Sequence, residues 1–218
     1  GSRLYDGVGG VSIERRRAMV RGMVALVKRP PARMTVDEFL EWDTGDNSGA
    51  RWQLIDGELV AMAPASQPHG AILIEFGRLL ANHLLNKGSP CRVIGEPGII
   101  PHVRAKQNFR IPDLGVTCSP DATGIMVPEP VLLIEIMSPS NEAETWANIW
   151  SYTTIPSVRE ILIVHSTRIE AELLRRRDDE NWPETPEIIH PPAALRLASI
   201  GFSAPLAALY RTTALAER

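Results

Sequence analysis

Two acidic residues in apolar surroundings constrain this chain more than any other feature of its sequence. Asp113 follows Pro112 and leads into an apolar stretch, while Glu135 lies in the middle of the apolar run Val131–Met137. A lone carboxylate in a buried strand costs several kcal/mol, and two that converge also repel each other. A divalent metal ion bound between them offsets both effects, and carboxylate oxygens suit Mg²⁺ or Mn²⁺.

A simpler interpretation of the same two residues stays open at this point. Glu135 would face solvent on a half-exposed sheet, and Asp113 would cap a turn. In that case neither residue would bind a metal, and the residues alone favour neither interpretation.

The pattern of the whole chain predicts an α+β domain built around a mixed sheet. A capping box at Thr35–Glu38 opens a short helix through Trp42, and a two-residue turn at Asp56-Gly57 joins a hairpin. Helical spacing marks residues 68–85 and 141–152. The expected strands are residues 51–55, 58–62, 92–95, 98–103, 109 or 112 to 118, 131–137, 161–165, 169–175 and 187–190. Residues 206–210 are expected to form either a helix or a strand.

Length and composition fit one soluble globular domain. With 218 residues, 44% hydrophobic and 22% charged, we expect a flexible extension over residues 1–33, beginning with a tag remnant, then a domain over 34–212 and a tail over 213–218. A net charge of −3 argues against a highly basic nucleic-acid coat protein. No apolar run approaches membrane-spanning length. Cys91 and Cys118 follow no zinc or redox spacing, so a reducing cytoplasm is the default location.

Several short segments, taken in order, resemble the Uma2 family, whose members are described as endonucleases. The resemblance covers about Met34 to Arg211, and the family is similar to restriction endonucleases of the PD-(D/E)XK type. It implies a restriction endonuclease-like core, with a mixed β-sheet flanked by helices and preceded by a helix and a hairpin. The segments that carry it are residues 51–60, 62–64, 69, 110–113, 135–140, 152, 155–160 and 164.

The resemblance also implies a site and a substrate. Asp113 and Glu135 would bind Mg²⁺ or Mn²⁺, and a metal-activated water would attack a phosphodiester bond of DNA. The polar residues around them would be Gln53, His69 and Asn148, with Glu58 and Glu144 as additional acidic groups. Because restriction-type nucleases commonly pair to cut two strands, a homodimer is expected.

Two departures from the family pattern create a second hypothesis. Gln53 stands where the family has a glutamate, and Asn148 stands where the helix after Ser138-Pro139-Ser140 has a lysine. Asn148 can bind a water molecule but carries no positive charge, and the chain has no lysine after Lys106. Lys106 or Arg110 could replace the missing cation in space. Alternatively, the chain has lost catalysis and acts as a nucleic-acid-binding or assembly module.

Simpler roles exist for three further groups of residues. His69 equally suits a hydrogen bond at a helix start, and Glu58 suits a cross-strand partner of Arg51. Trp146 and Trp150 lie four residues apart, a spacing that favours packing on the sheet or on a partner subunit over stacking on bases. The remaining histidines show no ligand spacing and are expected to be structural; they are His83, His102, His165 and His190.

Overall fold

A six-stranded mixed sheet forms the centre of the protein. The computed structural model describes residues 33–42, 51–120 and 124–217, which belong to one compact unit. The strands lie in the order β3-β4-β5-β6-β7-β8, and β5 and β6 are parallel while their other neighbours are antiparallel. Their bounds are Arg92–Gly95, Leu114–Thr117, Pro130–Met137, Glu160–His165, Ala171–Arg175 and Glu187–Ile189. The predicted α+β class with a mixed sheet is confirmed.

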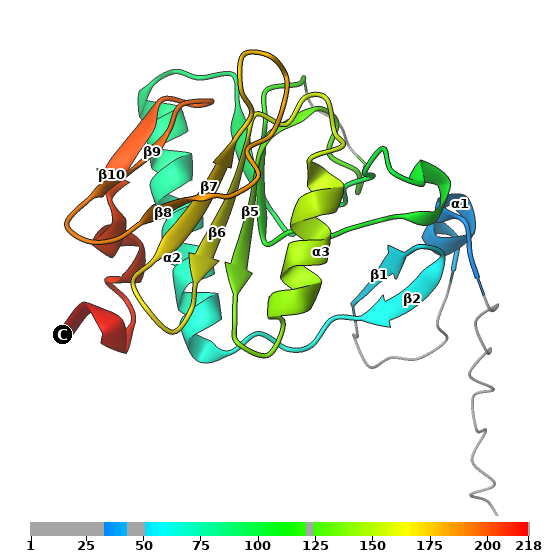
Figure 1. The fold of residues 1–218 in the computed structure, drawn as a ribbon, viewed down its shortest axis with the longest axis horizontal. Coiled ribbons are helices and arrows are strands. Elements are labelled where there is room, and N and C mark those ends of the chain that lie inside the picture. Colours follow the sequence, from blue (N-terminus) through cyan, green and yellow to red (C-terminus); the bar gives the residue numbers. More distant parts are fainter. Residues whose placement is uncertain (1–32, 43–50, 121–123, 218) are drawn as a thin grey trace, which may run out of the picture. The chain divides into compact units, whose positions relative to one another are not determined.

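Helices cover the two faces of this sheet, as Figure 1 shows. Side chains alternate along a strand, so Leu132, Ile134 and Ile136 of β5 pack with α2 (Gln67–Asn86). The alternate residues of β5 face α3 (Glu142–Tyr152), where Leu133 and Met137 join a second core cluster. Glu135 shares this α3 face, and its exposure of only 7% excludes the solvent-exposed alternative.

The N-terminal elements follow the local signals in the sequence. Thr35 and Glu38 form the predicted capping box, and α1 covers Val36–Leu40, ending two residues before Trp42. β1 (Trp52–Ile55) and β2 (Glu58–Ala61) form the predicted hairpin. Both turn residues, Asp56 and Gly57, have positive φ (51° and 85°), as the tightest hairpin turns require. Residues 1–32 of the expected extension lie outside the described residues.

One predicted strand is wrong. Residues 98–103 form two isolated bridges, Gly98 with Met126 and Ile99 with Arg110, instead of a ladder. Gly98 lies so close to the backbone oxygen of Ile125 and the ring of Phe109 that a side chain there would collide with both. The segment is therefore wedged between two loops, an arrangement that apolar alternation along residues 98–103 cannot reveal.

The two cysteines are bonded to each other, although their spacing in the sequence matched no zinc or redox motif. Cys91 and Cys118 form a disulfide, and they flank the paired strands β3 and β4, where Arg92 pairs with Thr117. Their spacing in the sequence did not indicate this bond, because it is the pairing of β3 with β4 that brings residues 27 positions apart together. Among the described residues, no helix has the length and apolar character needed to cross a membrane. The cytoplasmic location stays a prediction.

A buried carboxylate ties the C-terminal segment to the sheet. β9 (Ala194–Leu197) and β10 (Phe202–Pro205) form a separate hairpin that the sequence patterns did not predict. Glu160 at the start of β6 accepts hydrogen bonds from the backbone N–H groups of Ala198 (3.0 Å) and Ser199 (2.8 Å). The chain continues through the 3₁₀ helices η3 (Leu206–Tyr210) and η4 (Ala214–Glu217).

The role of Glu160 in holding the C-terminal segment can be tested against Glu187. The two residues are a matched pair, since Arg175 contacts both carboxylates. We expect Glu160→Ala to lower the free energy of unfolding by about 2–4 kcal/mol, because it removes a buried carboxylate that accepts from two backbone N–H groups and from Nε of Arg175. Glu187 is exposed, so Glu187→Ala should change the free energy of unfolding by less than about 0.5 kcal/mol. Urea denaturation measures both values, and equal losses would contradict the anchoring role.

Candidate functional site

Asp113 lies where β4, β5 and the start of α2 meet. Leu114 pairs with Ile134, which places the preceding Asp113 beside Glu135 on the neighbouring strand. The Oδ2 atom of Asp113 accepts a hydrogen bond from the backbone N–H of Ile136 (2.6 Å), and its Oδ1 atom lies 2.8 Å from Nε2 of His69. Both oxygens are therefore held in place, and the turn-capping alternative fails because the contacts are long-range.

Glu135 is a buried carboxylate held by two residues of α3. The hydroxyl of Tyr152 donates to its Oε1 atom at 2.7 Å, and Nδ2 of Asn148 donates to the same atom at 3.3 Å. Asn148 and Tyr152 are four residues apart and share one face of the helix. Burial raises the pKa of Glu135 well above its usual range, and the nearby charge of Asp113 raises it further. Burial and Glu135 likewise raise the pKa of Tyr152.

A buried arginine stands directly behind Asn148. Arg110 donates through Nη1 to Oδ1 of Asn148 (2.9 Å) and through Nη2 to Oδ1 of Asn108 (3.1 Å). Asn108 also accepts from the backbone N–H of Asp56 in the hairpin turn. Because the carboxamide oxygen of Asn148 faces the guanidinium, its amide nitrogen must face Glu135. Burial lowers the pKa of Arg110 from its usual value.

The structure gathers six of the seven residues suggested by the sequence around one cavity of about 230 Å³. These lining residues are Gln53, His69, Asp113, Glu135, Glu144 and Asn148. Gln53 donates through Nε2 to Glu144 (2.8 Å), whereas its buried Oε1 atom has no hydrogen-bond partner among the described residues.

Glu58, the seventh residue, does not line the cavity. It is exposed and follows the hairpin turn, and Arg51 pairs with Glu96 instead. The ring of His69 contacts Asp113, and its backbone N–H donates to the Ser66 hydroxyl at the start of α2, which is the alternative hydrogen bond considered from the sequence. The sequence did not single out Tyr152 as a partner of Glu135, although its helical spacing from Asn148 is the signal that could have shown it.

The residues around the cavity fit a hard divalent cation. Oε1 of Glu135 accepts both hydrogen bonds from α3, so Oε2 of this carboxylate is left for another partner. The partnerless amide oxygen of Gln53 belongs to the same cavity. Two carboxylates and an amide oxygen are typical ligands of Mg²⁺ or Mn²⁺, and a bound cation would lower the cost of burying Glu135 as an anion.

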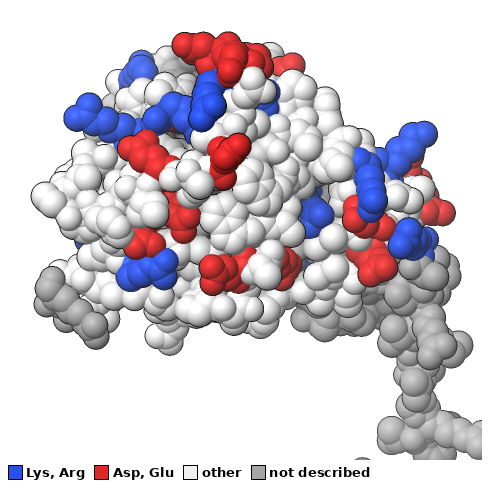
Figure 2. Space-filling model, viewed as in Figure 1, with Lys and Arg blue, Asp and Glu red and all other residues white. Residues whose placement is uncertain are grey.

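Basic and acidic side chains are interspersed on the face shown in Figure 2, without a broad basic patch there. This agrees with the net charge of −3. Attraction of a polyanion to this face would depend on individual arginines and on bound cations, more than on a general positive field.

A mixed sheet between two helices brings the carboxylates of Asp113 and Glu135 together, and a solved structure has a similar fold. The solved structure of a "putative nuclease belonging to DUF820" from Anabaena variabilis superimposes with a TM-score of 0.66, covering 81% of this chain and 97% of that one at 17% identity. The family model Uma2, described as "Putative restriction endonuclease", matches residues 36–207. The chain therefore belongs to the Uma2 family.

A curated relative extends the similarity over most of the sequence. The uncharacterized protein slr1290 of Synechocystis is 30% identical over 187 residues, which cover 84% of this chain and 94% of that protein. The fold and the family agree with the resemblance inferred from the short sequence segments.

The raised pKa of Glu135 predicts a stabilising substitution. Glu135→Gln keeps an oxygen acceptor for Tyr152 and Asn148 but removes the ionisable carboxyl, whose charged form burial disfavours. At neutral pH and without metal, we expect it to raise the free energy of unfolding by about 1–3 kcal/mol. Glu142→Gln, a change of an exposed carboxylate on α3, should not measurably change the free energy of unfolding.

The sign of the pH dependence follows from the same shift. Native Glu135 keeps its proton at pH values where the unfolded chain has lost it, so this group lowers the free energy of unfolding as pH rises from about 4.5 through the raised pKa. The advantage of Glu135→Gln should vanish near pH 4.5. Denaturation at several pH values tests this, and an advantage independent of pH would refute it.

Proposed function

We propose that this protein is a DNA endonuclease that hydrolyses phosphodiester bonds at the cavity formed by Asp113 and Glu135, with Mg²⁺ or Mn²⁺ as its cofactor. The observation that carries the proposal is the convergence on one cavity of two carboxylates and the amide oxygen of Gln53, for which the described part of the chain offers no hydrogen-bond partner. Membership of the Uma2 family supports nuclease chemistry. When bound, the metal would supply positive charge and a water of lowered pKa.

The protein residues would hold the reactants in position. Asp113 and Glu135 would be the metal ligands, with Gln53 contributing its free oxygen. Tyr152 and Asn148 fix one oxygen of Glu135, so the other oxygen has a defined direction. His69 fixes Oδ1 of Asp113 in the same way. This preorganisation matters because charge stabilisation depends on groups that do not have to reorient during the reaction.

The missing lysine is the main weakness of the cavity as a catalyst. Asn148 lines the cavity where the family pattern has a cation, and the nearest buried cation to it, Arg110, lies behind it and does not line the cavity. Arg110 would therefore act through Asn148 as a positioning residue. Its charge partly compensates Glu135, but it does not reach a bound water.

A second candidate function rests on this weakness. A chain with Gln53 and Asn148 in place of charged groups could retain the fold and bind nucleic acid without cutting it. In that case metal and DNA would still bind, whereas no strand would be cleaved.

Cleavage assays test the first function directly. With supercoiled plasmid and single-stranded DNA plus Mn²⁺ or Mg²⁺, we expect metal-dependent cleavage by the wild-type protein. Asp113→Asn and Glu135→Gln should each lower the rate at least about a hundredfold, since each removes a metal ligand. Glu58→Gln is the matched control, because Glu58 lies outside the cavity. Cleavage that survives both cavity substitutions would exclude this site.

A gain of function tests the position of the absent lysine. Asn148→Lys restores the cation of the family pattern, and we expect cleavage about tenfold faster or more, because an ammonium stabilises negative charge that an amide cannot. Asn148→Gln controls for the loss of the contact with Arg110. If the lysine variant is no faster than the glutamine variant, Asn148 does not occupy the catalytic cation's place.

The homodimer remains a further part of this proposal. One cavity can attack one strand at a time, so cutting both strands of a duplex at one position favours two copies of the chain. Sedimentation of the protein with and without duplex DNA measures the state.

A further inference from the structure

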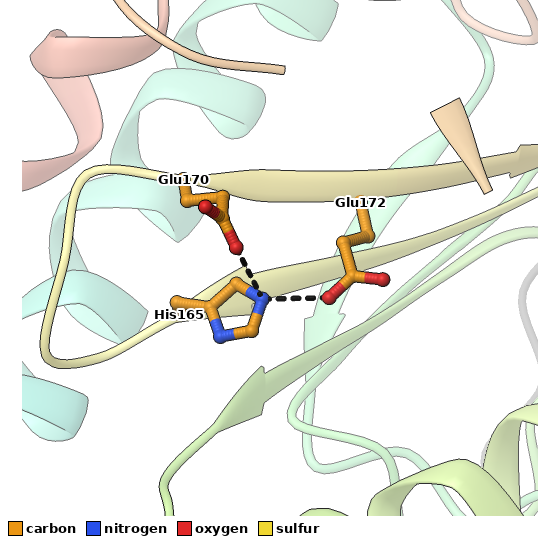
Figure 3. Close-up of side chains that lie close together, drawn as sticks. All are labelled: His165, Glu170 and Glu172. Atoms are coloured by element: carbon orange, nitrogen blue, oxygen red, sulfur yellow. Dashed lines mark hydrogen bonds and ion pairs between the residues drawn. The ribbon is translucent and has the colours of Figure 1, made fainter. Parts of the chain in front are cut away.

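A second cluster of metal-binding side chains lies at the turn between β6 and β7. His165, Glu170 and Glu172 place one ligand atom each within 4.8 Å of the others, as Figure 3 shows. Nε2 of His165 is 2.7 Å from Oε1 of Glu172 and 3.3 Å from Oε1 of Glu170. Sequence spacing gave no sign of this cluster, because the histidine ends one strand and the two glutamates begin the next.

This cluster is separate from the cavity of Asp113 and Glu135. Ile163 on β6 pairs with Glu135 on one side and with Glu172 on the other. Glu135 and Glu172 therefore share the α3 face of the sheet, two strand spacings or roughly 10 Å apart. None of the three cluster residues lines the cavity.

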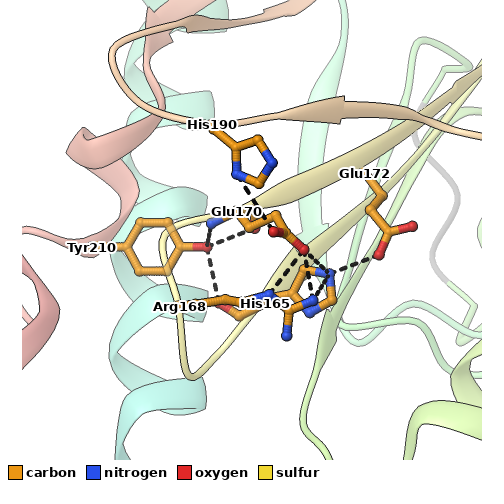
Figure 4. Close-up of polar contacts among 6 residues, drawn as sticks. All are labelled: His165, Arg168, Glu170, Glu172, His190 and Tyr210. Carbon is orange, nitrogen blue, oxygen red and sulfur yellow. Dashed lines mark hydrogen bonds and ion pairs between the residues drawn. The ribbon is translucent and has the colours of Figure 1, made fainter.

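The hydrogen bonds at Nε2 of His165 are mutually incompatible. Oε1 of Glu172 lies 2.7 Å from this nitrogen and can only accept, so this hydrogen bond needs a proton on Nε2. Nη2 of Arg168, at 3.2 Å, needs a bare lone pair on the same atom (Figure 4). A single ring nitrogen cannot satisfy both. The His165 side chain is 5% exposed, so water has little access to relieve the conflict.

A divalent cation resolves this conflict. It would take the lone pair of His165 and one oxygen from each glutamate, while Arg168, whose side chain is 54% exposed, could turn outward. In a tetrahedral zinc site with bonds of about 2.0–2.2 Å, neighbouring ligand atoms are roughly 3.3–3.5 Å apart, close to the separation of His165 and Glu170.

The protein has further groups that would support such a site. Nδ1 of His190, at the end of β8, lies 3.4 Å from Oε2 of Glu170. The hydroxyl of Tyr210 lies 2.9 Å from the backbone oxygen of His165 and 3.0 Å from that of Glu170, and its one hydrogen is shared between them, which holds the backbone at two of the three ligands. The ligands are thus attached to β6, β7 and, through Tyr210, to η3.

We propose that His165, Glu170 and Glu172 form a second metal site, selective for Zn²⁺ over Mg²⁺, that braces the turn between β6 and β7. Imidazole nitrogen favours zinc, whereas magnesium prefers oxygen ligands alone. The three protein ligands leave a fourth position for water or for His190. The site does not depend on the proposed nuclease activity.

Zinc titration of the Asp113→Asn/Glu135→Gln protein tests the proposal, because these isosteric changes disable the first site. By calorimetry we expect one zinc per chain in the presence of excess Mg²⁺, and a higher melting temperature with zinc. Adding Glu172→Gln or His165→Asn should weaken zinc binding at least about tenfold. Glu187→Gln, which changes an exposed carboxylate elsewhere, should leave zinc affinity unchanged.

Arg168→Ala provides a second, independent readout. Arg168 competes with the metal for His165 and Glu170, so its removal should tighten zinc binding several-fold. An ion-pair cluster without a metal function predicts the opposite pattern: no zinc bound in any of these proteins, or binding that Glu172→Gln and Arg168→Ala leave unchanged. Either result would overturn the proposal.

Discussion

The burial of Glu135 is the constraint on which the rest of the site depends. Its carboxylate lies in the central strand of the sheet, between apolar neighbours that face the two helical layers. A charge in that place must be compensated by partners at short range. Tyr152 and Asn148 donate hydrogen bonds to Glu135. Arg110 provides a positive charge on the far side of Asn148, to which it donates a hydrogen bond. The packing of α3 on the sheet therefore also lowers the free-energy cost of burying this carboxylate, because α3 carries both hydrogen-bond donors.

This compensation links distant parts of the chain. From Glu135 the hydrogen bonds pass through Asn148, Arg110 and Asn108 to the turn of the β1–β2 hairpin. The hairpin is bound to the same segment by backbone hydrogen bonds between Leu54 and Phe109. Gln53 can therefore reach Glu144 at the edge of the cavity although the two are 91 residues apart. Loss of one member leaves buried polar groups unpaired, so the network is expected to behave as a unit.

Local signals in the sequence predicted most of the helices and strands. The capping box at Thr35, the Asp56-Gly57 turn and the apolar run of β5 each depend on neighbouring residues, and each is confirmed. The β9–β10 hairpin was missed because its strands have only four residues each, so that the alternation in β9 is too brief to identify a strand. The disulfide and the bridges of Gly98 were missed because they join segments that are distant along the chain.

The contrast between local signals and contacts of distant segments also explains which residues of the candidate site could be predicted. Asp113 and Glu135 stood out because each breaks an apolar pattern in its own strand. Their partners did not, since an arginine 38 residues from Asn148 carries no mark of the contact that it makes. His165 was assigned a structural role for a related reason: its two carboxylate neighbours lie across a tight turn, where neither helical nor metal-motif spacing applies.

The two acidic clusters solve the same electrostatic problem in different ways. At Glu135 the compensating cation, Arg110, is itself buried and cannot leave, so a metal added there must coexist with it. At His165 the compensating cation, Arg168, is exposed and can be exchanged for a metal. A buried cation lowers the demand for a strongly bound metal, which suits a labile catalytic ion, whereas an exchangeable cation leaves a deep site for a tightly held structural one. The difference in burial of the two arginines therefore favours, for the two sites that we propose, an exchangeable ion at the first cluster and a tightly held ion at the second.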